Sequence, residues 1–534
     1  MTTVRLTNVS LLVGEPEDRL REICARMLHL SPNDLGPLRL KRRALDARKP
    51  TRLRRVYTVE VDVPLTPEKA ARLSGVTVVP EMPQRTLTLG TRPLRGRPVV
   101  VGAGPAGLFA AWRLGEMGYC PLLLERGKPV EERRRDTGLF WKRGILDPDS
   151  NVLFGEGGAG AFSDGKLTTR IKDPLRHEVL EHLVECGADE SILYDARPHL
   201  GTDRLYYLLR ELRNRLIAQG ADIRFNTRLD DLRLEEGVVG IATNRGLLET
   251  NALILAIGHS ARDTYRMLRR RGVAMEPKPF AVGVRVQHRQ ELIDRAQYGR
   301  AYGKADLDPA EYVLTCKTTR VGRSVYSFCM CPGGTVIPCA SEPGTLCCNG
   351  MSGRSRSGRF ANGAIVAHVT LDDVPTGDPL AGVEYQVRIE RSAFESTGGT
   401  YALPMMPFVD FVNDRPPQRR TTRLAKGRFP RADTVDIRNL LPAQVVAAIR
   451  EASHQFARSI PDWIADDAVV FGVETRTSAP VRIPRGADGQ SISTPGLFPA
   501  GEGAGYAGGI VSAAVDGLRA AEAVIQLHAR PVER

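Results

Sequence analysis

The stretch that decides the fold runs from residue 98 to residue 125 and reads PVVVGAGPAGLFAAWRLGEMGYCPLLLE. It begins with a short apolar strand, Pro98 to Val101, passes through a glycine turn into an apolar helix, and ends with a second strand at Leu124. Strand, glycine turn, helix and strand in this order are typical of a βαβ unit that binds a dinucleotide. The motif therefore predicts a parallel α/β sheet with a nucleotide at its edge.

Each residue type in this motif suits a bound dinucleotide. Gly102 allows a tight turn, Gly104 lets the backbone approach a pyrophosphate, and Gly107 lets the helix pack close to the strand. The N–H groups at the start of the helix are then free to bind phosphate. Glu125 ends the second strand, 18 positions beyond Gly107, and its carboxylate can accept ribose hydroxyls.

Two distant segments favour FAD over NAD(P) as the dinucleotide. Residues 496–510, GLFPAGEGAGYAGGI, predict a strand and a glycine-rich turn, followed by an Ala-rich helix from Val511 to Leu527. This segment can place backbone N–H groups and the Glu502 carboxylate beside a ribityl chain and a flavin ring. Residues 252–260, ALILAIGHS, predict a buried strand that closes at Gly258.

Taken as a whole, the sequence resembles a group of bacterial and plant FAD-dependent dehydrogenases of unknown substrate. The group lies within the two-dinucleotide-fold flavoproteins of the glutathione reductase superfamily. Nearly the whole chain shares this resemblance, which is carried by residues 154–167, 198–203, 278–285, 328–334, 349–352 and 472–478 and by the segment around Asp46–Lys49. It implies non-covalent FAD and a redox role. The chain departs from the group at Pro404–Pro407 and at the Cys347–Cys348 pair, so the resemblance does not predict which substrate the protein uses.

We predict an α/β fold, with a Rossmann-like FAD-binding domain, an inserted α+β substrate domain and a small N-terminal α/β domain. The expected boundaries are 1–95 for the N-terminal domain, 96–265 and 470–534 for the two parts of the FAD domain, and 266–469 for the insertion. The N-terminal domain is expected to hold strands at Val4–Leu12 and Val56–Val63 and a helix at Glu17–Leu28. Pro80–Arg97 is expected to be a linker.

The glycine string 155–165 is flexible enough to approach a flat ring or a pyrophosphate. Arg133 is a candidate partner of the pyrophosphate, with a solvated helix face as the alternative. The full set of predicted cofactor-binding residues is Gly102, Gly104, Ala106, Gly107, Glu125, Arg126, Arg133, Gly157, Gly158, Ser163, Gly258, Gly501, Glu502, Gly509 and Ile510. We predict no metal site, because the spacing of Cys and His residues shows no ligand pattern.

The sequence identifies no catalytic residue, but several side chains are candidates. Arg285, His288 and Arg476 could bind substrate, and a buried ion pair with Glu474 or another acid is an equal alternative for the arginines. Lys166 could hold negative charge on a reduced flavin or be a surface cation. Cys331 belongs to Cys329-x-Cys331, which could be a redox pair, a sulfur contact beside the flavin or two buried apolar residues.

The predicted function is hydride exchange between a small organic substrate and flavin N5 by an FAD-dependent oxidoreductase of the dehydrogenase type. The first alternative is a flavin monooxygenase that uses NAD(P)H as a transient electron donor without a dedicated NAD(P)H domain. The second is a tRNA- or RNA-acting flavoprotein that uses the basic residues 39–55, and a protein with purely structural FAD is a further option. The sequence does not identify the electron acceptor.

Composition limits the class of protein. The 534 residues suggest three or four domains at roughly 150 residues each, and 42% hydrophobic with 26% charged residues is typical of a folded soluble chain. The net charge of +13 attracts anions, but nucleic acid is not favoured as a partner. No apolar run is long enough for a membrane span and no signal peptide is apparent, so we expect a cytoplasmic protein with reduced cysteines and no membrane contact.

Overall fold

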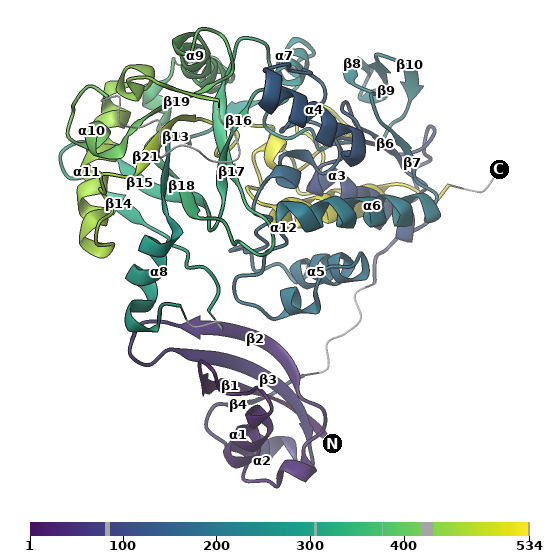
Figure 1. Cartoon of the computed structure of the whole chain (residues 1–534). Helices are drawn as coiled ribbons and strands as arrows, with labels where there is room; N and C mark the ends of the chain where they lie inside the picture. Colours follow the sequence, from purple (N-terminus) through teal and green to yellow (C-terminus); the bar gives the residue numbers. More distant parts are fainter. Residues whose placement is uncertain (81–85, 304–306, 376, 418–430, 532–534) are drawn as a thin grey trace.

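The computed structural model describes residues 1–80, 86–303, 307–375, 377–417 and 431–531. A small N-terminal unit, purple in Figure 1, lies at one end of the molecule, and two larger sheets lie next to each other beyond it. Part of the expected linker, residues 81–85, lies outside the described residues. Its later part runs beside the last helix, where Gly90 donates to the carbonyl of Ile525.

The N-terminal unit is a four-stranded antiparallel sheet with helices on one face. Its elements are β1 (Thr2–Leu12), α1 (Arg19–Leu28), β2 (Arg39–Asp46), β3 (Arg54–Val63), α2 (Pro67–Ala71) and β4 (Val76–Val78). The strand order β2-β3-β1-β4 places β3 between β1 and β2, the split βαβ arrangement of ferredoxin-like folds. Alternate residues such as Val59, Val61 and Val63 are fully buried with the helices in one apolar core.

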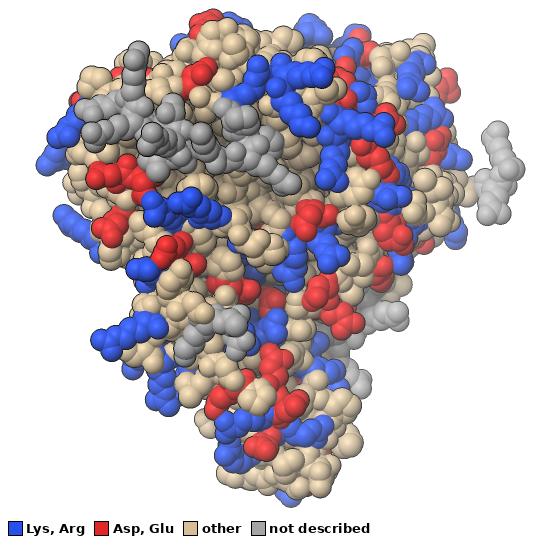
Figure 2. Space-filling model, in the orientation of Figure 1, with Lys and Arg blue, Asp and Glu red and all other residues tan. Residues whose placement is uncertain are grey.

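Strand β2 was not expected, because the basic stretch 39–55 hides the alternation of its side chains. Its cations are paired with acids: Arg39 with Asp62, Lys41 with Glu60, and Arg43 with Asp195 of the next unit. Acidic side chains are interspersed with the basic ones across the face seen in Figure 2, the N-terminal unit included. The basic stretch is therefore a charged sheet face with internal ion pairs.

A five-stranded parallel sheet forms the centre of the second unit. Its order is β23 (Leu497–Pro499), β11 (Leu253–Leu255), β5 (Val99–Val101), β6 (Leu122–Leu124) and β7 (Asp222–Arg224). Strands β23 and β11 pair in parallel with full register, so the C-terminal segment returns to the first βαβ unit as predicted. Both faces of this sheet are covered, as expected for strands such as β5, β6 and β11, which contain only buried apolar residues.

The alternation along each strand divides the core into two halves. Val100, Leu123 and Ile254 point to one face and pack with α3 (Pro105–Glu116) and α12 (Ile510–Leu527). Val99 and Val101 point to the other face, toward a three-stranded sheet. That sheet consists of β8 (Leu229–Leu234), β9 (Val238–Thr243) and β10 (Gly246–Glu249). The helices α4 (Val130–Arg143), α5 (Leu175–Glu185) and α6 (Thr202–Ala218) complete the helical side.

The third unit is a seven-stranded, mostly antiparallel sheet. Its order is β14 (Thr315–Lys317), β15 (Ser324–Cys331), β18 (Phe360–Val369), β13 (Phe280–Arg289), β21 (Val469–Glu474), β19 (Leu403–Pro407) and β20 (Ala432–Thr434). Its helices are α8 (Gln290–Tyr298), α9 (Ala381–Ser396), α10 (Phe408–Val412) and α11 (Ala443–Ser459). Two small ribbons lie nearby, β16 (Thr335–Cys339) with β17 (Cys347–Met351) and β12 (Glu276–Pro277) with β22 (Val481–Arg482).

Both expected boundaries of the insertion fall within regular elements of the structure. The boundary at 265/266 falls inside α7 (Arg262–Arg270), which packs on the parallel-sheet unit through Tyr265 and Leu268. The boundary at 469/470 falls at the start of β21, which pairs with β13 and β19. The chain thus leaves the seven-stranded sheet only after Glu474, because β21 is one of its central strands. In the described part of the chain, no helix is both long and apolar enough to cross a bilayer.

Candidate functional site

A cavity of about 400 Å³ lies between the parallel sheet and the seven-stranded sheet. Its first wall is formed at the carboxyl ends of β5, β6, β11 and β23 and by the loop from Leu153 to Ser163. Its second wall is formed by Phe328, Cys329, Asn349, Glu474, Arg476 and Thr477 of the seven-stranded-sheet unit. The carboxyl edge of a parallel sheet, where strand order reverses, is where such folds bind ligands, and the volume is within the ordinary range for ligand pockets.

Glycine backbone lines the middle of the first wall. Gly102, Gly104, Gly158, Gly501 and Gly509, the glycine cradle, all border the cavity. A Cβ atom on Gly104 would have Gly158 Cα as its nearest protein contact, at 3.9 Å. Space beside Gly104 is therefore open to a ligand and not filled by protein.

Two helices begin at this cradle. Gly104 is the N-cap of α3 and Gly509 is the N-cap of α12, and neither α3 nor α12 has an acidic residue in its first turn. The partial positive charge of each helix N-terminus is thus left for an anion in the cavity. Such a donor set fits the phosphates of an extended dinucleotide.

At one end of the first wall, Glu125 is buried and lines the cavity. Its carboxylate accepts hydrogen bonds from the backbone N–H groups of Ala103, Gly127 and Gly155, at 2.7, 2.9 and 3.0 Å. A carboxylate has about four acceptor positions, so one remains for a ribose hydroxyl. Glu125 thus fixes the glycine turn and can also meet the ligand.

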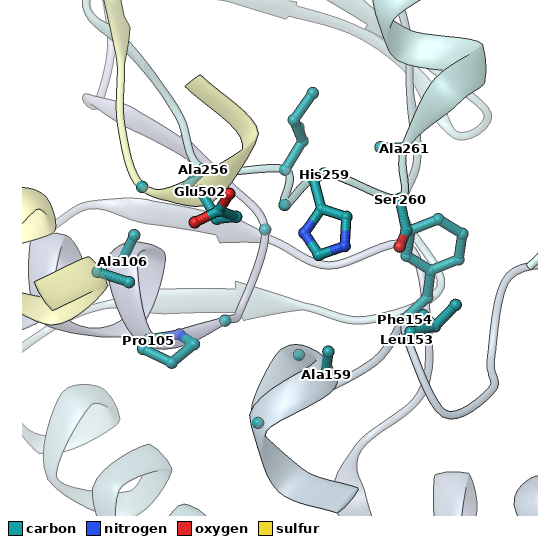
Figure 3. Close-up of a pocket in the computed structure, with 18 of the residues that line it drawn as sticks. Pro105, Ala106, Leu153, Phe154, Ala159, Ala256, His259, Ser260, Ala261 and Glu502 are labelled. Atoms are coloured by element: carbon teal, nitrogen blue, oxygen red, sulfur yellow. The ribbon is translucent and has the colours of Figure 1, made fainter. Parts of the chain in front are cut away.

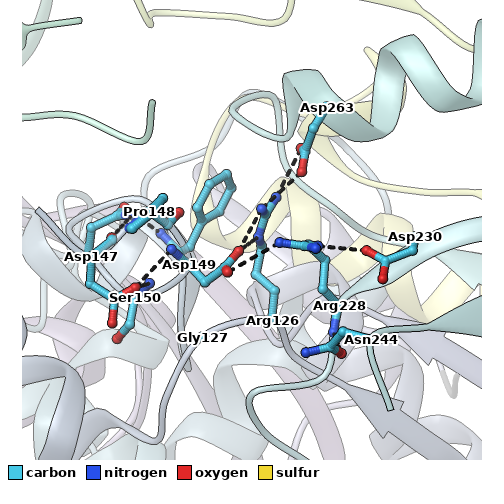
Figure 4. A network of polar contacts seen from close by, with 12 residues as sticks. Arg126, Gly127, Asp147, Pro148, Asp149, Ser150, Arg228, Asp230, Asn244 and Asp263 are labelled. Carbon is cyan, nitrogen blue, oxygen red and sulfur yellow. Dashed lines mark hydrogen bonds and ion pairs between the residues drawn. The ribbon is translucent and has the colours of Figure 1, made fainter. Parts of the chain in front are cut away.

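Arg126 lies at the rim of the same end, held by acids on two sides (Figure 4). Its guanidinium donates to Asp149 and to Asp263 of α7 at 2.7–3.0 Å, and it lies 4.2 Å from the centre of the Phe154 ring. Arg228 joins the network through Asp149. These contacts hold Arg126 flat against Phe154 at the edge of the cavity.

Three predicted cofactor residues do not line the cavity. Gly107 packs α3 on the turn, because a Cβ there would lie 1.7 Å from the Gly102 carbonyl oxygen. Gly157 has a φ of 83° and its Cβ would meet Leu209. Arg133 is fully buried and donates to the carbonyls of Asn151, Val152, Gly155 and Glu156. Arg133 therefore supports the glycine loop from behind, a role that neither sequence-based alternative described.

All other predicted cofactor residues line the cavity. They are Gly102, Gly104, Ala106, Glu125, Arg126, Gly158, Ser163, Gly258, Gly501, Glu502, Gly509 and Ile510.

The two candidate arginines of the second wall are both in buried ion pairs. Arg285 is fully buried and binds Glu474 through two hydrogen bonds of 2.9 and 3.0 Å. Arg476 lines the cavity but binds Glu390 at 2.8 and 3.0 Å and the Ser341 hydroxyl at 2.7 Å. Their charges are compensated, which matches the ion-pair alternative for each.

The structure places the remaining catalytic candidates, Lys166, His288 and Cys331, in three different environments. Lys166 lines the cavity and pairs with Glu311 at 3.1 Å. His288 lies outside the cavity, in the core of the seven-stranded-sheet unit, where Trp463 stacks on it and its Nε2 contacts the Trp463 carbonyl at 2.7 Å. Burial lowers the pKa of His288 to about 4. Cys331 is fully buried behind Cys329, which does line the cavity.

His259 lines the cavity but was not among the predicted cofactor-binding or catalytic residues. Figure 3 shows its ring in the cavity, between Glu502 and Ser260. Its Nε2 is buried without a hydrogen-bond partner. Burial, together with the charges of Arg476 and Arg262, lowers its pKa to about 3, so a neutral imidazole faces the cavity. The sequence signal was its position directly after Gly258, at the carboxyl end of β11.

Glu502 also faces the cavity, and it accepts a hydrogen bond from the Ala479 N–H at 2.7 Å. Burial raises its pKa to about 7, against an ordinary value of 4.5. Glu502 therefore holds a proton through most of the acidic range and can donate a hydrogen bond to a ligand.

We predict that protonated Glu502 stabilises the ligand-free protein near pH 5 and that this contribution is lost as pH rises from about 4.5 to about 7. In this range the folded state binds a proton at Glu502 that the unfolded state has lost, so at this group rising pH favours unfolding. The loss at Glu502 should be on the order of 1–3 kcal/mol, since one pKa unit is about 1.4 kcal/mol.

The contribution is measured as a difference between variants, because the buried imidazoles of His259 and His288, whose pKa values are lowered, change stability in the opposite direction. Urea unfolding at pH 5 and pH 8 gives the change in unfolding free energy of the native protein and of each variant. In Glu502→Gln this change should shift toward higher stability at pH 8 relative to pH 5. The control Glu249→Gln, on an exposed strand, should change as the native protein does, and an unaltered change in Glu502→Gln would contradict the assignment.

The fold and cavity define a class: a protein with a parallel βαβ nucleotide site facing a second, antiparallel sheet. Residues 279–477 match the family model "FAD-dependent protein, C-terminal domain-like", and residues 3–62 match a domain of unknown function (DUF8436). An uncharacterized protein of Clostridium beijerinckii is 41% identical over 526 residues, 98% of each chain. The chain belongs to the same family as this Clostridium protein, and the match of residues 279–477 to an FAD-dependent family gives FAD as its cofactor.

More distant similarities are limited to part of the chain or to low scores. Protein FixC of Escherichia coli strain K12 is 26% identical over 200 residues, 36% of this chain and 43% of FixC. The crystal structure of glycine oxidase from Geobacillus kaustophilus covers 82% of this chain and 96% of its own, with 13% identity and a TM-score of 0.36.

Proposed function

We propose that the cavity holds FAD and that the protein is an oxidoreductase of the dehydrogenase type, exchanging a hydride between a small organic substrate and flavin N5. The observation that carries this proposal is the construction of the cavity from two unlike walls. One wall offers the glycine cradle and two helix N-termini, and the other offers Phe328, Cys329, Asn349 and Arg476 from a separate sheet. When bound, FAD supplies the redox chemistry.

The residues of the chain then have distinct roles. Gly104 and Gly158 let the backbone approach the pyrophosphate, and Glu125 accepts a ribose hydroxyl. His259 and protonated Glu502 offer hydrogen bonds without adding charge inside the cavity. The second wall covers the ring, excludes water and leaves a place for the substrate between the two sheets. Lys166, although paired with Glu311, keeps a cation at the cavity that would favour negative charge on a reduced ring.

The test is an anaerobic absorption titration of the purified protein. NADH, NADPH and a panel of small hydroxy and amino acids are added one at a time, with free FAD in buffer as the control. Loss of the flavin absorbance with an organic compound alone supports the dehydrogenase. Loss with NAD(P)H only when an organic compound is also present would replace it with the monooxygenase. A protein whose flavin no donor reduces would overturn the proposal and leave FAD with a structural role.

A further inference from the structure

Two cysteine side chains meet at the second wall of the cavity. Cys329 is half-buried and borders the cavity, whereas Cys331 is fully buried behind it. The Cys331 thiol donates to the Cys329 carbonyl oxygen at 3.4 Å. One sulfur thus borders the cavity, and the other is buried two residues further along the same strand.

The backbone at this position is irregular. Strand β15 contains one residue more than its partner β18 between the pairs Phe328–Ala364 and Cys331–Asn362, which is a β-bulge. Cys329 has a φ of 42°, a left-handed conformation that is rare and costly for a residue other than glycine. Such strain is concentrated at functional sites, and here the strained residue borders the cavity.

Arg285 holds this strained conformation. Its Nη1 donates to the Cys329 carbonyl oxygen at 3.1 Å, while the rest of its guanidinium is fixed by Glu474. The contact with Cys331, together with the charges of Arg285 and Lys166, lowers the pKa of Cys329 to about 7, and the pKa of Cys331 is raised well above its usual range. Cys329 therefore has the properties of an attacking thiol, and Cys331 has those of its buried partner.

We propose that Cys329 and Cys331 are a redox-active thiol pair that exchanges two electrons with the flavin in this cavity. In the oxidising direction the two S–H bonds break, one S–S bond forms, and both electrons and both protons pass to oxidised FAD. The reverse step reduces the disulfide. This inference rests on the proposed function, because it needs a flavin bound beside the second wall.

A regular strand holds the Cα atoms of residues i and i+2 about 6.6–6.8 Å apart, at the upper end of the range that disulfides span. Cys329 and Cys331 lie at a β-bulge with left-handed backbone at Cys329, so this regular spacing is not imposed on the pair. Cys329 is also the sulfur that faces the cavity, so an external disulfide or thiol is the class of substrate that the pair can serve by thiol–disulfide exchange.

The first test does not depend on flavin activity. The full-length protein, stripped of FAD, is alkylated with iodoacetamide at pH 7 and the modified peptides are identified by mass spectrometry. We expect Cys329 to react faster than Cys120, the other half-buried cysteine of the described chain. In Cys331→Ala the rate at Cys329 should fall roughly tenfold, as its pKa returns toward about 8.5. Mild oxidation of the native protein should give a peptide with a 329–331 disulfide.

The second test uses the FAD-loaded, oxidised protein in a reductive titration with dithionite. The native protein and the control Cys120→Ala should consume one two-electron equivalent beyond that of the flavin, whereas Cys329→Ala and Cys331→Ala should consume only the flavin's. Equal consumption in all four proteins, with no 329–331 disulfide, would overturn the thiol pair while leaving hydride exchange intact. Failure of every organic donor to reduce the flavin would instead overturn the proposed function, and the alkylation result would be unaffected by it.

Discussion

Replacing Gly104 with alanine is expected to remove most of the affinity for FAD without unfolding the protein. Gly104 has ordinary extended backbone, with φ −78° and ψ −179°, so alanine brings no strain. A Cβ there has no protein atom nearer than 3.9 Å, but it would project into the space assigned to the pyrophosphate. Overpacking of this kind costs about 1–3 kcal/mol, which is roughly ten- to a hundredfold in Kd.

The measurement is a titration of the flavin-free protein with FAD, together with a thermal melt. Gly138→Ala is the matched control, because a Cβ on this α4 glycine meets no atom within 4 Å, and it should bind FAD normally. An unchanged Kd for Gly104→Ala would place the cofactor elsewhere. Gly107→Ala, whose Cβ would lie 1.7 Å from a carbonyl oxygen, should instead fail to fold correctly.

The second large effect is expected from Glu390→Gln. Glu390 is fully buried on α9 and binds Arg262 and Arg476 through four hydrogen bonds of 2.8–3.0 Å. Burial alone would raise its pKa, but the charges of Arg262 and Arg476 lower it well below its usual range. Removing the carboxylate takes away the ion pair of the buried Arg476 and leaves Arg262 with Glu342 alone, at a cost of about 3–5 kcal/mol of unfolding free energy.

Urea unfolding at neutral pH measures this loss. Glu384→Gln on the same helix is the control, because Glu384 is 53% exposed and pairs only at the surface with Arg266, a contact worth about 1 kcal/mol or less. Equal losses in the two variants would show that the buried network contributes no more than a surface pair. Because Arg476 lines the cavity, Glu390→Gln should also weaken FAD binding, whereas Glu384→Gln should not.

The parallel sheet and its glycine turn were predictable because their chemistry is local. The tight turn at Gly102, which has a φ of 103°, and the close packing of Gly107 on that turn both lie within one βαβ unit. The return of residues 497–499 followed from a second strand and turn. Strand β2 was missed because five of its eight residues are charged. Arg133 could have been placed correctly: Val130, Arg133, Thr137 and Phe140 follow helical spacing and are all buried, so they mark the inner face of α4.

The second wall could not be predicted, because its residues come from distant parts of the chain. Cys329 comes to lie beside Arg285 because β18 pairs with both β13 and β15 and because β15 bulges at Cys329. No sequence pattern predicts a cysteine with left-handed backbone. Similarly, Arg476 meets Glu390 across 86 positions. For Arg285 and Arg476 the sequence left two alternatives, an ion pair or a substrate contact. The pairing of β13 with β21 brings Arg285 to Glu474, and α9 carries the Glu390 that binds Arg476.

The most direct measurement is a crystal structure of the protein with FAD. The account predicts one FAD per chain, bound non-covalently, with its pyrophosphate at Gly104 and its ring between the Gly501–Ile510 segment and the wall of Phe328, Cys329 and Arg476. A flavin that lies outside this cavity, or a ring that does not face the second wall, would contradict the account.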